Sequence, residues 1–510
     1  MRNRTHNSSG WRRGIGLLSI ATAMAVALPA QDARSSAAVF SVLANLTDGS
    51  YSGLAQGTDG NFYGTNGSNF YGTAYQMTPA GTLTTIYNFC SQPNCADGSF
   101  PPQAPAALAL GVDGNFYGTT TAGGAGDPSI CFIGCGTIYQ LTPSGALTVL
   151  YTICSQPNCA DGMGNGSGLV LGPDGNFYGT MPGGGANNNS THCPYGCGTV
   201  FQITPAGAFT TIYNFCSQTN CSDGANPGPL TVGLDGNLYG IASGGGTLGI
   251  GVVFKLSLSA TLTVLHSFES GNADGACWTG CLAGLVQAPN GNLYGVTASG
   301  GRFNPYLNQP DGVMFQVTSS GTYNVVHTFC SLPHCADGYQ PEALVYVNAG
   351  LLFGITIVGG STASPCTIYG CGTLFVTSAK GLLPIHYFSG ATDGFNPVAL
   401  IQATSGPLYG VTEAGGSSGQ GTIYSLSAPV LKPFIQPVPS FGRVAAQVMI
   451  LGNNLTGATS VTFNGTAAAF TVLSDTEITA TVPAGASSGK VQVVAPTGTL
   501  SSNLSFQVLP

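Results

Sequence analysis

The sequence predicts an all-β protein, a seven-bladed β-propeller followed by a second, smaller β domain. Gly accounts for 77 of the 510 residues and only 6% of the residues are charged, against about a quarter in ordinary globular chains. A phrase of the form DGN-[FL]-YG recurs seven times in intact or degenerate form. The last repeat lacks its final strand, while a lone copy of that strand stands ahead of the first repeat.

The composition also excludes several classes of protein. So few charged residues exclude a coiled coil, a helix-rich protein held by ion pairs and a charged disordered tail. The net charge of −8 gives no basic footprint for a nucleic-acid partner.

Residues 1–30 are typical of a secretory signal peptide. Four arginines precede an apolar run over 15–30 that ends in small residues, which is the pattern of an export signal. The run is shorter than the roughly 20 apolar residues that span a membrane. Its removal takes four of the 11 basic residues and none of the 19 acidic residues, which leaves a net charge of −12. We therefore expect an extracellular, cell-surface or periplasmic protein without a membrane span.

Residues 37–428 form the repeat region. Each repeat carries the DGN-[FL]-YG phrase, then a phrase such as GTIYQLTP, and in six repeats a phrase such as LTTIYNF. In the second repeat, alternation and turn residues predict strands over 106–112, 115–121, 136–142 and 146–154. Seven four-stranded units favour a β-propeller over the alternative, an open β-solenoid. The strand over 39–46 is predicted to pair with 421–426 and close the ring, which removes the exposed sheet edges.

The two recurring phrases resemble those of the GloVer tandem-repeat family of secreted bacterial "choice-of-anchor" proteins, over roughly 39–428. That family has no established activity that the resemblance would imply. A weaker resemblance, in the DGN-[FL]-Y turn, is to propellers of the streptogramin-lyase type.

A Pro-rich linker is predicted over 429–440 and a second domain over 441–510. The phrases GNNL at 452–455, VTFNG at 461–465 and VPAG at 482–485 resemble the IPT/TIG domain. The resemblance implies a small immunoglobulin-like β-sandwich that serves as an adhesive, spacer or carbohydrate-associated module.

The 16 cysteines form eight local pairs. Between blades they are Cys90 with Cys95, Cys154 with Cys159, Cys216 with Cys221, Cys277 with Cys281, and Cys330 with Cys335; between second and third strands they are Cys131 with Cys135, Cys193 with Cys197, and Cys366 with Cys371. In an exported chain, disulfides are the default. Zinc is the rival interpretation, but zinc sites favour C-x2-C spacing. Both kinds of loop emerge on one face of a propeller, so we expect a disulfide-bonded face.

An Asp-Gly pair recurs in every connection between blades. Its aspartates are Asp48, Asp97, Asp161, Asp223, Asp274, Asp337 and Asp393. The favoured interpretation is structural: each carboxylate caps its own loop. The alternative is a binding ring of carboxylates for Ca²⁺ or for a cationic or polyhydroxylated ligand. No cofactor is otherwise expected.

The histidines do not form a recognisable catalytic set. His266, His327 and His386 stand where other repeats have Tyr, so they are interpreted as packing positions. His192 and His334 neighbour cysteines. The leading hypothesis is a secreted or cell-surface protein that binds an extracellular protein or glycan through its Cys-rich face. The alternatives are an extracellular lyase or hydrolase acting on a polysaccharide or macrocycle, and a structural surface component.

Overall fold

The computed structural model describes residues 38–47, 52–67, 71–102, 107–125, 131–164, 166–188, 193–269, 274–276, 283–301, 303–304, 309–347, 350–362, 366, 369–378 and 381–510. The predicted signal peptide, Asp48, His192, Cys277 and Cys281 lie outside the described residues.

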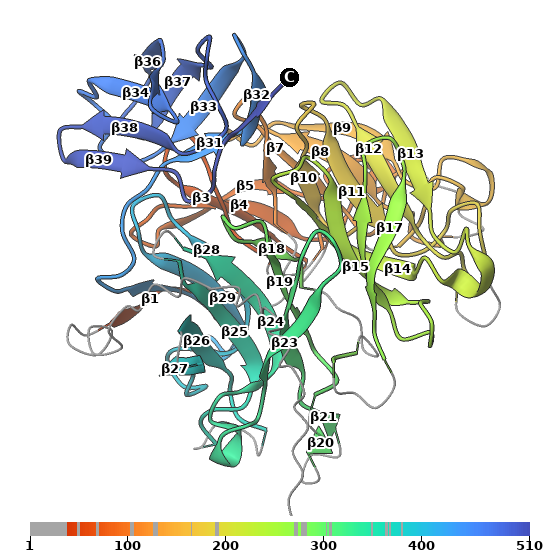
Figure 1. Cartoon of the computed structure of the whole chain (residues 1–510). Coiled ribbons are helices and arrows are strands. Elements are labelled where there is room, and N and C mark those ends of the chain that lie inside the picture. Colours follow the sequence, from red (N-terminus) through yellow and green to blue (C-terminus); the bar gives the residue numbers. More distant parts are fainter. Residues whose placement is uncertain are drawn as a thin grey trace, which may run out of the picture.

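Seven four-stranded antiparallel sheets make up the β-propeller (Figure 1). Blades 1 to 4 are β2 (Ala55–Gln56), β3 (Phe62–Asn66), β4 (Thr73–Met77), β5 (Leu83–Asn88); β6 (Ala109–Leu110), β7 (Phe116–Thr119), β8 (Thr137–Leu141), β9 (Leu147–Thr152); β10 (Leu169–Leu171), β11 (Phe177–Met181), β12 (Thr199–Ile203), β13 (Phe209–Asn214); and β14 (Ala225–Val232), β15 (Leu238–Gly244), β16 (Val252–Leu256), β17 (Leu262–Ser267).

Blades 5 to 7 are β18 (Val286–Gln287), β19 (Leu293–Thr297), β22 (Val313–Val317), β23 (Tyr323–Thr328); β24 (Tyr339–Tyr346), β25 (Leu352–Val358), β26 (Thr373–Ser378), β27 (Gly381–Tyr387); and β28 (Phe395–Gln402), β29 (Leu408–Ala414), β30 (Thr422–Ser427), β1 (Val39–Asn45). The short strands β20 (Phe303–Asn304) and β21 (Gln309–Pro310) pair with each other inside blade 5. Four 3-10 turns, η1 (Pro93–Cys95), η2 (Pro157–Cys159), η3 (Thr219–Cys221) and η4 (Pro333–Cys335), follow outer strands.

The ring is closed by its two ends, as the sequence predicted. Strand β1 pairs antiparallel with β30, from Val39 opposite Ser427 to Asn45 opposite Thr422. The N-terminal strand is thus the outer strand of blade 7, and the last blade has the same four strands as the others.

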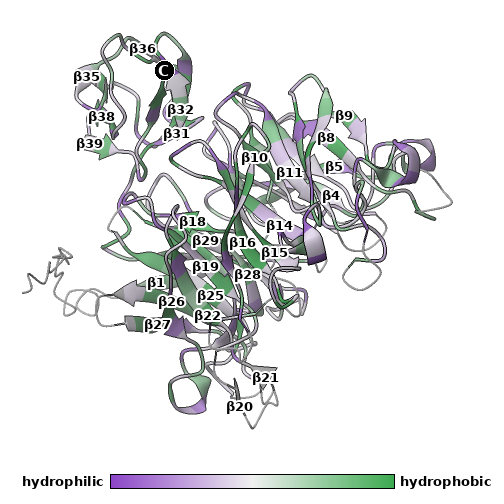
Figure 2. Cartoon of the chain, turned by 45° about the vertical axis from the view of Figure 1, so that its right-hand side comes forward, coloured by the Kyte–Doolittle hydropathy of each residue, from purple (hydrophilic) through white to green (hydrophobic). Residues whose placement is uncertain are grey.

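The recurring phrases pack against one another in a fixed register. Gly179 in β11 lies opposite Phe201 in β12, and a Cβ on Gly179 would lie 2.5 Å from Cζ of that ring. Only a glycine therefore leaves room for the aromatic side chain of the next strand. Hydrophobic residues are frequent along the strands (Figure 2). Buried clusters join neighbouring blades, as where Tyr117 of blade 2 packs with Phe177 and Phe201 of blade 3, so the core lies between the blades.

The predicted strands of the second repeat differ from the observed ones mainly in length. The first strand of blade 2 was predicted over 106–112, but β6 contains only Ala109 and Leu110. The innermost strands of blades 1 and 5 are equally short, whereas those of blades 4, 6 and 7 have eight residues.

The C-terminal domain is a small β-sandwich. Its strands are β31 (Gln436–Val438), β32 (Phe441–Arg443), β33 (Gln447–Leu451), β34 (Ser460–Phe463), β35 (Thr466–Ala467), β36 (Phe470–Val472), β37 (Glu477–Thr481), β38 (Val491–Ala495), β39 (Gly498–Ser501) and β40 (Gln507–Leu509). They form two four-stranded sheets, ordered β31-β33-β37-β36 and β35-β34-β38-β39, and a parallel pair, β32 with β40.

The predicted linker over 429–440 is wrong in its second half. Strand β31 lies within it and pairs with β33, with Pro437 opposite Ile450. Because β31 is an edge strand, Pro437 can be accommodated although it has no N–H to donate. The Pro-rich composition concealed this strand.

The C-terminal domain is docked on one end of the propeller. Val438, Met449 and Leu451 pack against Leu110 and Leu171, which end the innermost strands of blades 2 and 3. Hydrogen bonds join the domain to blades 7 and 1: Thr404 Oγ1 to the Gly452 carbonyl (3.0 Å), Asn503 Nδ2 to Gln402 Oε1 (2.9 Å), and Thr476 Oγ1 to the Thr58 carbonyl. The domain therefore lies at the end opposite the loops between blades, against blades 7, 1, 2 and 3.

Among the described residues, the structure contains no helix with the length and apolar character that crossing a membrane requires.

Candidate functional site

Local disulfides hold the loops at one end of the propeller. The bonded pairs are Cys90–Cys95, Cys131–Cys135, Cys154–Cys159, Cys193–Cys197, Cys216–Cys221, Cys330–Cys335 and Cys366–Cys371. Within the described part of the chain every cysteine is bonded. Each bond lies within one loop, either between blades or between second and third strands, and both kinds of loop emerge at the same end. We call this end the disulfide-bonded face.

The eighth predicted disulfide is not among the bonds that the structure describes. Both Cys277 and Cys281 lie outside the described residues, so the bond between Cys277 and Cys281 stays a prediction. The capping role of Asp48 stays a prediction for the same reason.

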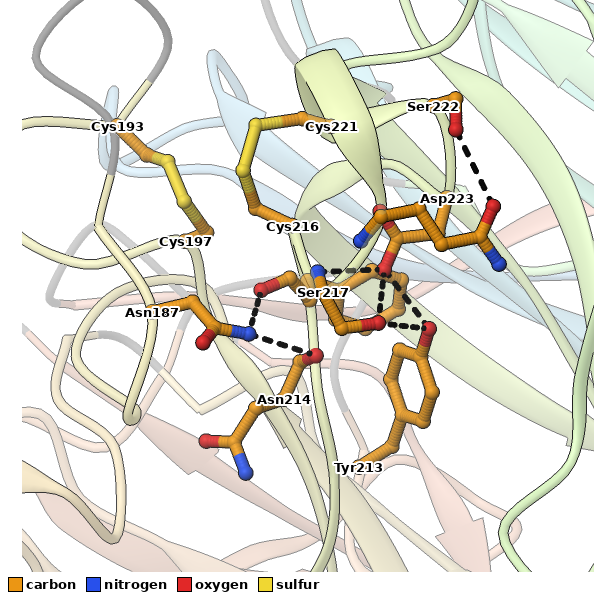
Figure 3. The surroundings of a disulfide bond; sticks show 12 residues. Asn187, Cys193, Cys197, Tyr213, Asn214, Cys216, Ser217, Cys221, Ser222 and Asp223 are labelled. Carbon is orange, nitrogen blue, oxygen red and sulfur yellow. Dashed lines mark hydrogen bonds between the residues drawn. A yellow bond between two sulfur atoms is a disulfide. The ribbon is translucent and has the colours of Figure 1, made fainter.

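Neighbouring disulfides contact each other across two loops. Cys193–Cys197 in the loop after β11 lies beside Cys216–Cys221 in the loop after β13 (Figure 3), with the four sulfur atoms within 4.8 Å of one another. Asn187 adds hydrogen bonds from Nδ2 to the carbonyl oxygens of Asn214 (3.3 Å) and Phe215 (2.9 Å). The two loops of blade 3 are thereby fixed to each other.

The aspartates of the connections between blades are hydrogen-bonded inside their own loops. Oδ2 of Asp223 accepts from the Ser217 N–H (2.9 Å), the Ser217 hydroxyl (2.9 Å) and the Tyr213 hydroxyl (2.7 Å), and Oδ1 accepts from the Gln218 N–H (3.2 Å). The same arrangement surrounds Asp97 and Asp161. All three residues are at most 1% exposed.

In three blades a histidine takes the place of the tyrosine. Nε2 lies 2.7 Å from the Asp carboxylate in His266–Asp274, 2.9 Å in His327–Asp337 and 3.0 Å in His386–Asp393. His266 also stacks on Tyr323, with 3.7 Å between ring centroids, and His386 stacks on Phe40 at 3.8 Å. The histidines therefore pack against aromatic rings, as expected. They also form hydrogen bonds with the aspartates, which the sequence did not predict.

The electrostatics of these carboxylates follow from the same contacts. Burial raises the pKa of Asp337, but hydrogen bonds from His327, the Leu332 N–H and both donors of Ser331 outweigh it and lower the pKa below its usual value. The pKa of Asp97 is lowered in the same way, with Tyr87 as its strongest donor. These bonds support the capping interpretation, since the oxygens face their own loops; binding of Ca²⁺ or another ligand by the ring stays a hypothesis.

A second recurring network explains why two of the phrases occur in register. Oδ1 of Asp113 accepts from the Asn115 N–H (3.2 Å), while Oδ2 accepts from the Tyr117 hydroxyl (2.9 Å) and from Nε2 of Gln140 (2.9 Å). Blades 1 and 3 repeat it at Asp59 and Asp174. In blade 4 Lys255 replaces the glutamine and lies 2.7 Å from Asp235. In blades 1 to 3 the Gln of the third strand thus pairs with the Asp-Gly-Asn turn, a link that the sequence did not reveal.

Large apolar side chains are exposed at the tips of the disulfide loops. Phe132 is 95% exposed within the Cys131–Cys135 loop, and Tyr195 is 80% exposed within the Cys193–Cys197 loop. Ile133, Leu332 and Tyr369 are exposed in loops of the same face. The sequence could have indicated that Phe132 and Tyr195 are exposed, because an aromatic side chain between two closely spaced, bonded cysteines cannot reach the core.

The recurring phrases of the propeller identify the family of this chain. A protein-family comparison matches the Gloeobacter/Verrucomicrobia repeat at residues 31–193 and 191–369. The chain belongs to the Gloeobacter/Verrucomicrobia repeat family. This Gloeobacter/Verrucomicrobia repeat protein carries an IPT/TIG domain at 433–508, which includes strand β31 and confirms the predicted C-terminal module.

Solved structures resemble the fold of the Gloeobacter/Verrucomicrobia repeat protein at low identity. A streptogramin B lyase is 13% identical with a TM-score of 0.49, covering 77% of this chain and 98% of its own. An extracellular domain assigned to a hybrid two-component system of B. thetaiotaomicron is 13% identical with a TM-score of 0.46, covering 92% of this chain and 54% of its own. No curated protein is similar to this chain in sequence.

Proposed function

We propose that this protein is a secreted or cell-surface binding protein whose contact surface is the disulfide-bonded face. The observation that carries the proposal is the near-complete exposure of Phe132 and Tyr195 at the tips of loops closed by disulfides. An exposed aromatic ring is unfavourable in water, and such residues are typical anchors of binding surfaces. The predicted export signal and the disulfides support an extracellular location.

The segments 131–135 and 193–197 are suited to binding because a disulfide restrains each of them. Ordering a flexible loop on binding costs conformational entropy, which a loop closed by a disulfide has lost beforehand. The C-terminal domain occupies the opposite end of the propeller, so it leaves this face accessible and can serve as a spacer.

We infer that the ligand is a neutral glycan. Only 6% of the chain is charged, so the face offers little complementarity to a charged protein partner. Aromatic rings present a flat apolar surface with a polar edge on Tyr, which fits the C–H face of a sugar ring.

A glycan array with the intact protein tests this proposal. The parent should bind a defined set of glycans, and the double substitution Phe132→Ser, Tyr195→Ser should weaken that binding at least tenfold. Leu473→Ser, at a residue 57% exposed on the C-terminal domain, is the matched control and should bind like the parent. Equal binding by the parent and the double variant would overturn the proposal.

An extracellular lyase or hydrolase is the second candidate, favoured by one cavity. A cavity of about 490 Å³ beside blade 4 is lined by His266 and Glu269, and Asp274 bonds to the His266 ring and to the Glu269 N–H. A His–Asp pair with a nearby carboxylate is suited to acid–base chemistry. On this hypothesis His266→Tyr, which introduces the residue found at this position in blades 1 to 3, should abolish polysaccharide cleavage by the protein. Unchanged cleavage would exclude this cavity as the active site.

A further inference from the structure

A small chamber lies on the propeller axis. It has a volume of about 180 Å³ and is lined by residues of the innermost strands, or of the segments just before them, in blades 1, 2, 5, 6 and 7. Ten of its lining residues are Gly, Ala, Val or Leu, and the eleventh is Glu342. The side chains that line the chamber are therefore apolar except for one carboxylate.

Glu342 is buried without a partner. The residue is 6% exposed, and within the described part of the chain it accepts no hydrogen bond and forms no ion pair. Buried carboxylates are otherwise paired or hydrogen-bonded, as the loop aspartates of this protein are. Glu342 therefore calls for an explanation that packing does not supply.

The repeat itself does not require an acid at this position. Glu342 is the extra residue in the bulge of β24, between Pro341 opposite Thr356 and Ala343 opposite Ile355. Blade 7 has the same bulge between Pro397 and Ala399, where the extra residue is Val398. An apolar residue thus suits the geometry, and the carboxylate in blade 6 is an addition to it.

The charge around Glu342 is negative. Burial, together with the Glu413 carboxylate of blade 7, raises the pKa of Glu342 to about 8. The other lining residues carry no titratable side chain. A cation that entered the chamber would relieve both the unpaired carboxylate and the repulsion between the two acids.

We propose that the axial chamber binds a small organic ammonium ion, with Glu342 as its counter-ion and the Leu, Val and Ala side chains around its hydrocarbon part. The apolar side chains around Glu342 suit the hydrocarbon part of an organic cation better than they suit Ca²⁺, which takes six to eight oxygen ligands and commonly several carboxylates. The volume corresponds to about six water molecules at the roughly 30 Å³ that each occupies in the liquid, which admits a short alkylammonium ion.

The chamber lies toward the end of the propeller at which the C-terminal domain is docked. Leu344 and Leu400 of its lining are two residues before the ends of β24 and β28. Leu110 and Leu171, which end two other inner strands, pack against the C-terminal domain. This site is independent of glycan binding by Phe132 and Tyr195, and either proposal can fail alone.

Calorimetric titration of the full chain with n-pentylammonium chloride tests the proposal, with 1-pentanol as the neutral probe of similar shape. The parent should bind the ammonium ion saturably at pH 8.5, at least tenfold more tightly than the alcohol. Binding should weaken as the pH falls from 8.5 to 6.5, because Glu342 must release its proton to pair with the cation.

Glu342→Gln should weaken ammonium binding at least tenfold, while Glu477→Gln in the C-terminal domain is the matched control and should bind like the parent. Thermal unfolding of Glu342→Gln, expected at or above the parent temperature, shows that the variant is folded. Absence of saturable ammonium binding by the parent, equal binding of alcohol and ammonium, or undiminished binding by folded Glu342→Gln would each overturn the proposal.

Discussion

The hydroxyl of Tyr213 donates a 2.7 Å hydrogen bond to the carboxylate of Asp223 (Figure 3), which ties the outer strand of blade 3 to the connection that leads into blade 4. Ser217 bonds to the same oxygen through its N–H and its hydroxyl. Because equivalent residues repeat this arrangement in other blades, it is a structural module of the repeat.

We expect Asp223→Ala to destabilise the propeller. The substitution removes the charged acceptor of the hydrogen bonds from Ser217, Gln218 and Tyr213, which costs about 1–3 kcal/mol. The midpoint of thermal unfolding should fall by several degrees. Asp475→Ala, at an exposed aspartate of the C-terminal domain that accepts one long hydrogen bond (3.4 Å), is the control. Equal unfolding temperatures for Asp223→Ala and the parent would contradict the capping role.

The pH dependence of stability should reveal the contribution of Asp337. Its pKa is lower in the folded protein than in the unfolded chain, so its stabilising effect is present above the unfolded value of about 3.9 and is lost as the pH falls through the folded pKa. Parent and Asp337→Asn should therefore differ in unfolding temperature by a constant amount between pH 5 and 7.

Below pH 4 that difference should shrink, because the parent carboxyl then also takes up a proton. A difference that stays constant down to pH 2 would show that ionisation of Asp337 does not contribute. His327→Tyr restores the residue of the other blades and should keep the hydrogen bond to Asp337, so its profile should follow that of the parent.

The blade architecture could be predicted because its signals are local and repeated. The shared glycines, the turn phrases and the displaced strand at 39–46 each specify a position in the fold, and the structure confirms the closing strand. The partners of the polar side chains could not be predicted, since the link from Gln140 to Asp113 joins a strand to a turn 27 residues earlier in the chain. Glu342 was missed for the same reason: its isolation depends on the chamber, which residues of five blades line.

Gly179→Ala should destabilise blade 3 although it adds a single methyl group. The new Cβ would lie 2.5 Å from Cζ of Phe201, a buried ring that cannot move away without displacing its neighbours. Overpacking of this kind costs about 1–3 kcal/mol, measured by denaturant unfolding. At Gly284, an added Cβ would meet no atom closer than 3.7 Å, so Gly284→Ala is the control. A loss in Gly179→Ala no larger than in Gly284→Ala would refute the steric explanation.

Phe40→Ala should weaken ring closure. Phe40 in β1 stacks on His386 at 3.8 Å and lies 5.1 Å from Tyr424, so its ring joins the N-terminal strand to blades 6 and 7. Removing a large packed ring costs about 3–5 kcal/mol when the ring is fully buried, and somewhat less is expected here. Val39→Ala, at the neighbouring residue that is 57% exposed, should be nearly neutral.

Loss of closure has a second readout. If β1 detaches from β30, a sheet edge is exposed that favours association of chains. Size-exclusion chromatography during mild heating should then show oligomers of Phe40→Ala before those of Val39→Ala. Identical behaviour of the two variants would mean that backbone pairing alone holds the strand in place.

Met449→Asp should undock the C-terminal domain without unfolding it. Along β33, Val448 and Ile450 enter the core of the domain, whereas Met449 faces the propeller with Leu171 and Leu110. A carboxylate at position 449 would be buried in an apolar contact with no cation to pair with, which is unfavourable by several kcal/mol. Calorimetry should resolve two unfolding transitions where the docked parent shows coupled unfolding, and small-angle scattering should show a longer particle. Leu473→Asp places the same charge on a solvent-exposed part of the domain and should leave both measurements unchanged. If both variants change, the charge acts on the domain itself and not on its contact with the propeller.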